Sequence, residues 1–259
     1  MSYRHAVRTI VCLLGCLLVA SAAAAPFKLD VVVLPKPGFP APATEVTPTG
    51  PRLEVVSSSY RSPIAPTQPP AGRPSWAPRT FRGADLQRTI HQRPNVFLVY
   101  GRDGSSGRFL VGARAGALRY AFDFVKFANP PNGGWFEEVT WARESDGVLY
   151  VENTHLTYAS ATRNRNAYIS AIDLGTRKVL WRSRALVANT RTFVLAGNLI
   201  VAGYGFTQER DFLYLLDRET GRVLDRLGVP SAPERIVLRD GRLHVRTYDR
   251  QVIARIVAS

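Results

Sequence analysis

Residues 168–181 read YISAIDLGTRKVLW, and residues 212–225 read FLYLLDRETGRVLD. Aligned on Asp173 and Asp217, both copies continue to a Val-Leu pair at the same offset, about 44 residues apart. A strand-rich unit repeated at such a period is typical of blade-type repeat architectures. The two copies therefore predict a fold built from repeated β-sheet units.

Each copy has the pattern of a β-hairpin. An apolar run leads up to the Asp, and in the first copy its side chains alternate between two faces, as in a half-buried strand. The Asp carboxylate can then accept hydrogen bonds from backbone N–H groups in a turn. Gly221 in the second copy supplies the positive φ that such a turn usually needs. Each unit is thus predicted to contain a strand, an Asp-led turn and a returning strand.

The segments AIDLGTRKVLW and LLDRETGRVLD resemble the repeats of the PQQ-like (quinoprotein-type) β-propellers, whose hairpins carry an Asp, a Thr-Gly pair and a Trp. The resemblance is close over residues 168–227 and loose over the rest of the chain after residue 94. Two positions depart from the pattern. The first copy has Arg177 where the Gly would stand, and the second has Asp225 in place of the Trp.

The resemblance implies one of two classes of protein. One is a non-catalytic scaffold, like the PQQ-like proteins of outer-membrane assembly. The other is a quinoprotein-type dehydrogenase, a family that typically uses a larger ring, a calcium ion, an aromatic floor under the quinone and often a vicinal disulfide. The short chain and the lack of cysteines after Cys16 argue against the dehydrogenase. We therefore expect no cofactor.

Residues 94–259 are expected to form an all-β domain, because many short strands follow one another and no segment has a sustained helical period. We predict a PQQ/WD40-like β-propeller of about four four-stranded antiparallel blades. The first unit, from Asn95, lacks a first strand, and the last unit lacks its fourth. The termini could complete one blade between them. The alternative is an open twisted arc completed by a partner or by residues 27–34.

Residues 1–24 are predicted to be a signal peptide. Arg4 and Arg8 precede an apolar run from residue 10 to 20, and small residues reach Ala24. This predicts export to the periplasm or outside the cell, with no transmembrane span after cleavage. Both cysteines, Cys12 and Cys16, lie in this segment, so the mature chain has no disulfide. Lipidation at Cys16 is disfavoured because the apolar run continues after it, through Leu17, Leu18, Val19 and Ala20.

Residues 25–93 are rich in proline, which removes backbone donors and fixes φ. We predict a largely disordered tether. Two apolar runs interrupt it, at residues 27–34 and 53–56. Either run could add to the domain as an edge strand or be recognised by a partner through strand addition. An inert spacer is the interpretation that this composition favours.

The connections between predicted strands differ in length in a regular way. Tight turns join first to second and third to fourth strands, whereas the second-to-third and between-blade connections are long, so the insertions fall on one face. Such loops are where binding groups usually lie. The predicted binding residues on this long-loop face are Trp135, His155, Tyr158, Arg163, Arg165, Tyr204 and Arg210. We expect Trp141 and Trp181 to pack between blades.

The formal net charge is +14. One predicted strand places Arg242, His244 and Arg246 on the same face. This secondary basic face could dock on an acidic surface, a lipid headgroup layer or an anionic glycan. The alternative, which we favour from the sequence, is a solvated edge strand whose charges prevent aggregation. Nucleic acid is not an expected partner, because the chain is predicted to be exported.

The sequence contains no pattern typical of catalysis. The histidines are far apart, and there is no Gly-x-Ser-x-Gly elbow, phosphate loop or calcium loop. Glu137 and Glu138 should point to opposite faces of a strand. We therefore expect a non-enzymatic exported propeller that binds a protein or an anionic envelope component through its long-loop face. A carbohydrate-binding or hydrolytic propeller is the alternative, because fold does not determine function.

Overall fold

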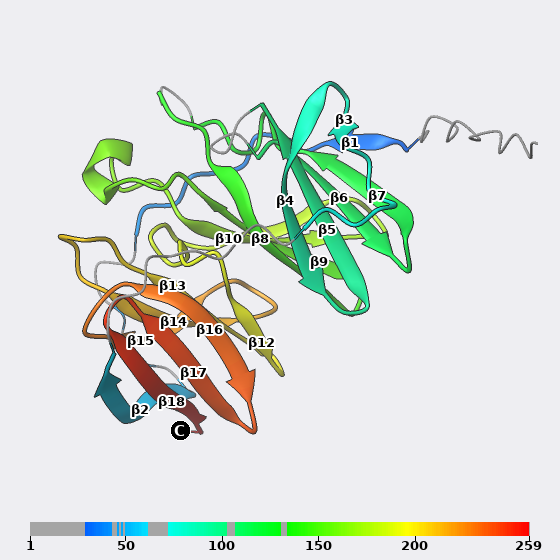
Figure 1. The fold of residues 1–259 in the computed structure, drawn as a ribbon. Helices are drawn as coiled ribbons and strands as arrows, with labels where there is room; N and C mark the ends of the chain where they lie inside the picture. The colour runs from blue at the N-terminus through cyan, green and yellow to red at the C-terminus, as the bar shows by residue number, and fades with distance from the viewer. Residues whose placement is uncertain are drawn as a thin grey trace, which may run out of the picture.

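A computed structural model describes residues 29–42, 46, 48, 50–61, 72–102, 107–130 and 134–258. The expected signal peptide, residues 1–24 with Cys16, lies outside this range. The described residues form four sheets, numbered here in the order in which the chain builds them (Figure 1). A short 3-10 helix, η1 (Ala159–Thr162), precedes β10.

Each sheet is a ladder of neighbouring strands. The first sheet contains, in spatial order, β1 (Val31–Val33), β7 (Ala117–Asp123), β6 (Phe109–Arg114), β5 (Asn95–Gly101), β4 (Ala84–Gln92) and β3 (Thr80–Phe81). The second contains β11 (Val179–Arg182), β10 (Tyr168–Asp173), β9 (Val148–Thr154) and β8 (Glu138–Ser145). The third contains β12 (Val194–Ala196), β13 (Leu199–Tyr204), β14 (Phe212–Asp217) and β15 (Val223–Gly228). The fourth contains β16 (Pro233–Arg239), β17 (Arg242–Thr247), β18 (Arg250–Val257) and β2 (Arg52–Tyr60).

All neighbouring strands run antiparallel except β1, which runs parallel to β7. The predicted all-β class with four-stranded antiparallel units is therefore confirmed. Apart from β1, β2 and β3, each sheet is built from four or three strands in chain order, as in a propeller blade.

The two repeated hairpins have the same turn. The backbone N–H and hydroxyl of Thr176 both donate to Asp173 Oδ1, at 2.6 and 2.7 Å. Thr220 makes the same two bonds to Asp217 Oδ1, at 2.8 and 2.6 Å. The residue after each Thr has a positive φ, 61° at Arg177 and 69° at Gly221. The sequence repeat is thus a structural repeat, with the predicted Asp-led turn.

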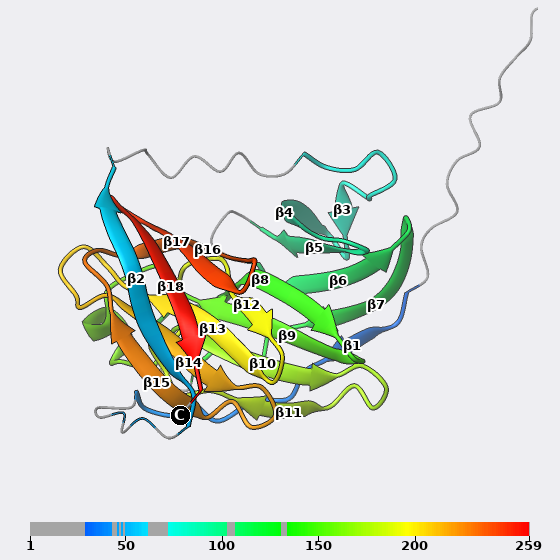
Figure 2. The same cartoon turned by 90° about the horizontal axis from the view of Figure 1, so that it is seen from below.

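Three apolar interfaces hold consecutive sheets together, first to second, second to third and third to fourth. The side chains are fully removed from water, which stabilises the fold by roughly 1.5–3 kcal/mol for each large aliphatic or aromatic residue. Representative buried pairs across the three interfaces are Phe122 and Val151, Ile169 and Ile200, and Leu215 and Val245. The sheets consequently form an arc in chain order (Figure 2).

The outer face of the first sheet is covered by the chain that leads into it. Phe81 packs against Tyr100 and Phe109, with ring centroids 5.5 and 5.6 Å apart. Ala77, Ala84 and the partly buried Trp76 belong to the same apolar cluster. This face is therefore closed by residues 76–86 rather than by packing against the fourth sheet in the manner of the other three interfaces.

Trp181 and Asp225 hold equivalent positions in the repeat but have different partners. Trp181 lies against Gly221 of the next hairpin, where an added Cβ would come within 2.3 Å of the ring, and its Nε1 donates to the Arg218 carbonyl at 3.2 Å. Trp181 thus packs between blades as expected. Asp225 instead accepts a 2.6 Å hydrogen bond from the N–H of Leu53, the buried residue of β2. The Asp that replaces the Trp of the repeat at position 225 is thus the residue to which β2 attaches.

The predicted domain boundary at residue 94 is wrong. β4 pairs with β5 along nearly its whole length and supplies the first strand that the first unit lacked. β2 pairs with β18 and completes the fourth sheet. The composition of residues 25–93 predicts a tether because proline dominates it, but the strands lie between the prolines. The alternative prediction, that residues 53–56 add as an edge strand, is the one that the structure confirms.

The segment before β2 is also bound to the sheets. β1 adds to β7, and Tyr168 donates from its hydroxyl to the Pro40 carbonyl at 3.2 Å. The Arg182 guanidinium lies against the rings of Phe39 and Tyr168, 4.5 and 4.0 Å from their centroids, and pairs with the buried Glu137. Residues 31–42 therefore form part of the domain.

Asp225→Ala should weaken the attachment of β2. The variant removes a buried charged acceptor from the Leu53 N–H, so we expect the free energy of unfolding to fall by about 1–3 kcal/mol. Asp225→Asn keeps an acceptor oxygen, so its free energy of unfolding should fall by less than that of Asp225→Ala. Urea unfolding followed by circular dichroism measures both. Equal stability of Asp225→Ala and the parent would contradict the role of Asp225.

Candidate functional site

The long connections leave the sheets at one end, because strand direction alternates within each sheet. Two of them dock on each other. The ring of Tyr158 packs edge-on against Phe206, with centroids 4.7 Å apart. Glu209 accepts from the Ala159 N–H at 2.6 Å and from the Tyr204 hydroxyl at 2.5 Å. The loops 155–166 and 205–211 are thus one ordered surface.

The predicted binding residues on this surface divide into two groups. Tyr204 is buried and its hydroxyl is engaged by Glu209, so burial together with this hydrogen bond raises its pKa. His155 faces the Phe136 carbonyl at 3.1 Å through Nδ1, and Tyr158 is 37% exposed. Trp135 is half-buried beside Phe136, which packs on the first interface. These aromatic residues mainly hold the loops in place.

The arginines of the long-loop face remain available. Arg163, Arg165 and Arg210 are exposed. Arg163 caps the short helix η1 with φ 53°, which fixes the direction of the chain at this point. The structure therefore places a basic rim of three exposed arginines on the loops.

The fourth sheet carries a second basic surface that is wider than the sequence indicated. Residues directly opposite one another on neighbouring antiparallel strands share a face. Arg239, Arg242 and Arg255 stand in one row with Glu54 across the four strands. Arg235, Arg246 and Gln251 stand in another. Between these rows lie Val237, His244 and Ile253. We call this surface, defined by the three rows, the basic face.

β17 is not an edge strand, contrary to the interpretation favoured from the sequence. It lies between β16 and β18, so protection against edge-to-edge pairing does not account for Arg242, His244 and Arg246. Two carboxylates offset part of the charge: Glu54 pairs with Arg255 at 3.0 Å and Glu234 with Arg246 at 3.0 Å. The basic face keeps an excess of arginines.

A cavity of about 670 Å³ joins the basic face to the centre of the arc. Residues on or next to β4, β8, β12 and β16, one strand from each of the four sheets, contribute to its wall. Arg143, Arg235 and Arg246 line it together with His91 and Trp141. Among the described residues that line it, none is an Asp or a Glu. Burial lowers the pKa of Arg143, because it disfavours the charged guanidinium. An anion placed in the cavity would stabilise that charge.

The basic face and the cavity together form the candidate site, named here the basic cleft. The sequence indicates only the residues of the basic cleft that lie on β17, because Arg242, His244 and Arg246 alternate along that strand. Arg235 and Arg143 come from other strands, and their convergence depends on the strand register and on the arc. Trp141, expected to pack between blades, does contact both neighbouring interfaces, but it also borders the cavity.

A buried carboxylate lies beside the cavity. Glu152 of β9 stands opposite Trp141 and accepts from the Thr140 hydroxyl at 2.7 Å and the Arg191 N–H at 2.9 Å. Burial, only partly offset by these bonds, raises its pKa from 4.5 to about 7. The neighbouring Glu138 lies 3.7 Å from Arg88, and Glu137 pairs with Arg182. Glu137 and Glu138 thus have separate partners, as expected.

Within the described part of the chain, no group of three His, Cys, Asp or Glu side chains is placed to hold a metal ion. Among the same residues, no helix has the length and apolar character needed to cross a membrane.

Among known proteins, the chain is similar only to solved structures. No family model and no curated protein matches the chain. The computationally designed Ika4 protein is 14% identical, with a TM-score of 0.43 over 69% of this chain and 93% of that one. The designed Ika8 protein is 14% identical, with a TM-score of 0.44 over 67% and 46%. BamB from Moraxella catarrhalis is 12% identical, with a TM-score of 0.42 over 66% and 45%.

These likenesses are low in identity, and the chain matches less than half of the length of Ika8 and BamB. The β-propeller-like fold is therefore assigned from the chain's own four sheets and their arc. Membership of the PQQ-like family stays a prediction that rests on the two repeated hairpins.

Glu152→Gln should change the pH dependence of stability. A carboxyl group with a raised folded-state pKa contributes stability below its unfolded value, and that contribution is lost as pH rises through about 7. We expect the parent to lose about 3 kcal/mol from this group between pH 4.5 and pH 8. Urea unfolding over this range should show a flatter profile for Glu152→Gln. If the free energy of unfolding changed with pH in the same way in parent and variant, the raised pKa of Glu152 would be contradicted.

Proposed function

We propose that this chain is an exported, non-enzymatic propeller scaffold that binds an acidic segment of an envelope protein in the basic cleft. The observation that carries the proposal is the convergence of arginines from three strands of the fourth sheet onto one solvent-facing surface, next to a cavity without lining carboxylates. A cationic surface beside a concave, partly apolar cavity favours an anionic partner through electrostatic complementarity.

The composition of the basic face favours a protein over other anions. Val237 and Ile253 lie between the arginine rows, so apolar and cationic groups alternate across the surface. Protein interfaces are enriched in arginine and bury apolar side chains near their centre. Arginine also binds carboxylates through two parallel hydrogen bonds. An extended acidic segment with apolar residues would satisfy both kinds of contact.

The long-loop face is the second surface in this proposal. Arg163, Arg165 and Arg210 are exposed on loops that the contacts of Tyr158 and Glu209 hold in place. The sequence favoured this face for partner binding, and its ordered loops are consistent with that role. Export is supported by the pattern of residues 1–24 alone.

Two matched triple variants distinguish the surfaces. Arg239, Arg242 and Arg255 are changed to Ala in one, and Arg163, Arg165 and Arg210 in the other. Both remove three exposed arginines, so the loss of net charge is the same. A fluorescent peptide of alternating Glu and Val is titrated with residues 25–259, and fluorescence anisotropy gives Kd. We expect the first variant to weaken binding about tenfold or more, equivalent to about 1.4 kcal/mol, and the second to weaken it less.

The outcomes separate the alternatives. Equal weakening in both variants would show attraction by overall charge and contradict a specific site. Weakening only in the loop variant would move the site to the long-loop face. Binding of dextran sulfate or of vesicles with anionic lipid, in preference to the peptide, would replace the protein partner by a glycan or a membrane surface.

A further inference from the structure

The two repeated hairpins differ at one turn position. Gly221 adopts φ 69°, a conformation that glycine takes freely, whereas Arg177 adopts φ 61° at the equivalent position of the first copy. A side chain in this region strains the backbone. The backbone strain at Arg177, which the second copy avoids with Gly221, suggests that the Arg177 side chain has a function.

The Arg177 side chain lies between the first and second sheets. Its guanidinium is 5.5 Å from the centroid of the Tyr120 ring and 5.8 Å from that of Phe122. Tyr120 of β7 thus faces Arg177 as Trp181 of β11 faces Gly221. Gly112 permits this arrangement, because an added Cβ there would come within 2.2 Å of the Tyr120 ring. Arg177 is held in place by aromatic rings on the first sheet.

One nitrogen of this guanidinium, Nη1, is buried without a hydrogen-bond partner within the described structure. A buried donor that lacks an acceptor is costly, and charged donors are the costliest. The two aromatic rings stabilise the cation but offer no acceptor for a strong hydrogen bond. The donor therefore suits an acceptor that is brought by a ligand.

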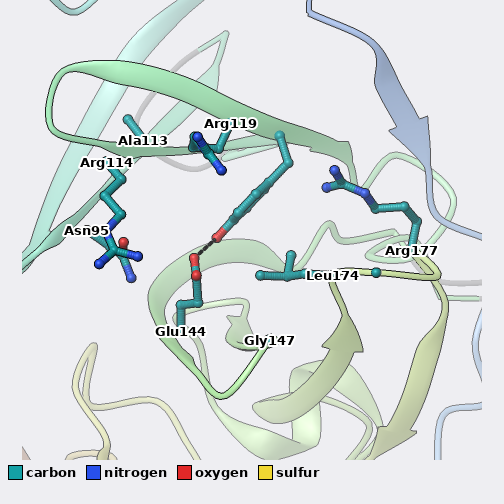
Figure 3. Close-up of a pocket in the computed structure, with 10 residues that line it drawn as sticks. Asn95, Ala113, Arg114, Arg119, Glu144, Gly147, Leu174 and Arg177 are labelled. Atoms are coloured by element: carbon teal, nitrogen blue, oxygen red, sulfur yellow. Dashed lines mark hydrogen bonds between the residues drawn. The ribbon is translucent and has the colours of Figure 1, made fainter.

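A pocket of about 330 Å³ lies beside Arg177 at the turn end of the two sheets. Arg114 and Arg119 stand on the side of the pocket opposite Arg177 (Figure 3). Glu144 is the single carboxylate in the lining, and it accepts a 2.7 Å hydrogen bond from the Tyr120 hydroxyl. Three guanidinium groups against one engaged carboxylate leave the pocket positively charged.

We propose that this pocket binds a small molecule with a carboxylate or phosphate group, and that the Arg177 guanidinium donates to that group. Arg114 and Arg119 supply further positive charge from the other side. The site is separate from the basic cleft, with which it shares no lining residue. Carboxylate and phosphate oxygens have the charge and the geometry that a guanidinium recognises best.

Arg177→Gly tests the site without threatening the fold, because it restores the residue of the second copy and removes the strained φ. The melting temperature of residues 25–259 is measured with succinate, with inorganic phosphate and with chloride at matched ionic strength. Without the two oxyanions, we expect the variant to melt at or above the parent temperature. In the parent, succinate or phosphate should raise the melting temperature, and in Arg177→Gly only the general salt effect should remain. Arg222→Ala, which removes an arginine outside the pocket, should respond like the parent.

Isothermal titration calorimetry of the same proteins provides the second measurement. Saturable binding to the parent and to Arg222→Ala, weakened about tenfold or more in Arg177→Gly, is the expected result. Preference for succinate or for phosphate identifies the ligand group. Equal responses of parent and Arg177→Gly to both anions would overturn the proposal. So would a variant that melts well below the parent, because Arg177 would then act as a structural residue.

Discussion

The pairing of β2 with β18 is the constraint on which the rest of the structure depends. The two strands join residues about 200 positions apart, and Asp225 fixes the start of β2 through the Leu53 N–H. Without β2 the fourth sheet would have three strands and an unpaired edge at β18, which in a sheet protein invites aggregation. A segment dominated by proline thus completes the last blade, and the chain needs no further repeat to do so.

This arrangement explains why the arc has a basic surface at one end. Six faces of the sheets, two at each of the three interfaces, are used for apolar packing between neighbours, and the outer face of the first sheet is covered by residues 76–86. The remaining face of the fourth sheet carries arginines. The two departures from the repeat have local causes of the same kind: Asp225 receives β2, and Arg177 faces Tyr120 beside a pocket.

The repeated hairpins could be predicted from the sequence because their signals are local. Alternating apolar residues, the Asp at 173 and 217 and the Thr three positions later all act within one turn. β2 was harder to recognise, since Leu53 is its single buried residue and Ser57, Ser58 and Ser59 are exposed. The sequence does not predict β4, because this strand precedes Pro94, where the change in composition predicts the domain boundary. The basic face required the register of four strands, and only Arg242, His244 and Arg246 share a strand from which it could be read.

Disulfide trapping tests the placement of β2 most directly, because the chain has no cysteine after Cys16. Ser59 and Gln251 stand opposite each other on β2 and β18, whereas Ser59 and Arg255 do not. The account predicts that Ser59→Cys with Gln251→Cys gives an intramolecular disulfide on mild oxidation, with loss of free thiols in the monomer band. Ser59→Cys with Arg255→Cys should not. Equal trapping of both pairs, or no trapping of the first, would contradict the pairing of β2 with β18, and a covalent dimer would show that β2 is exchanged between two copies.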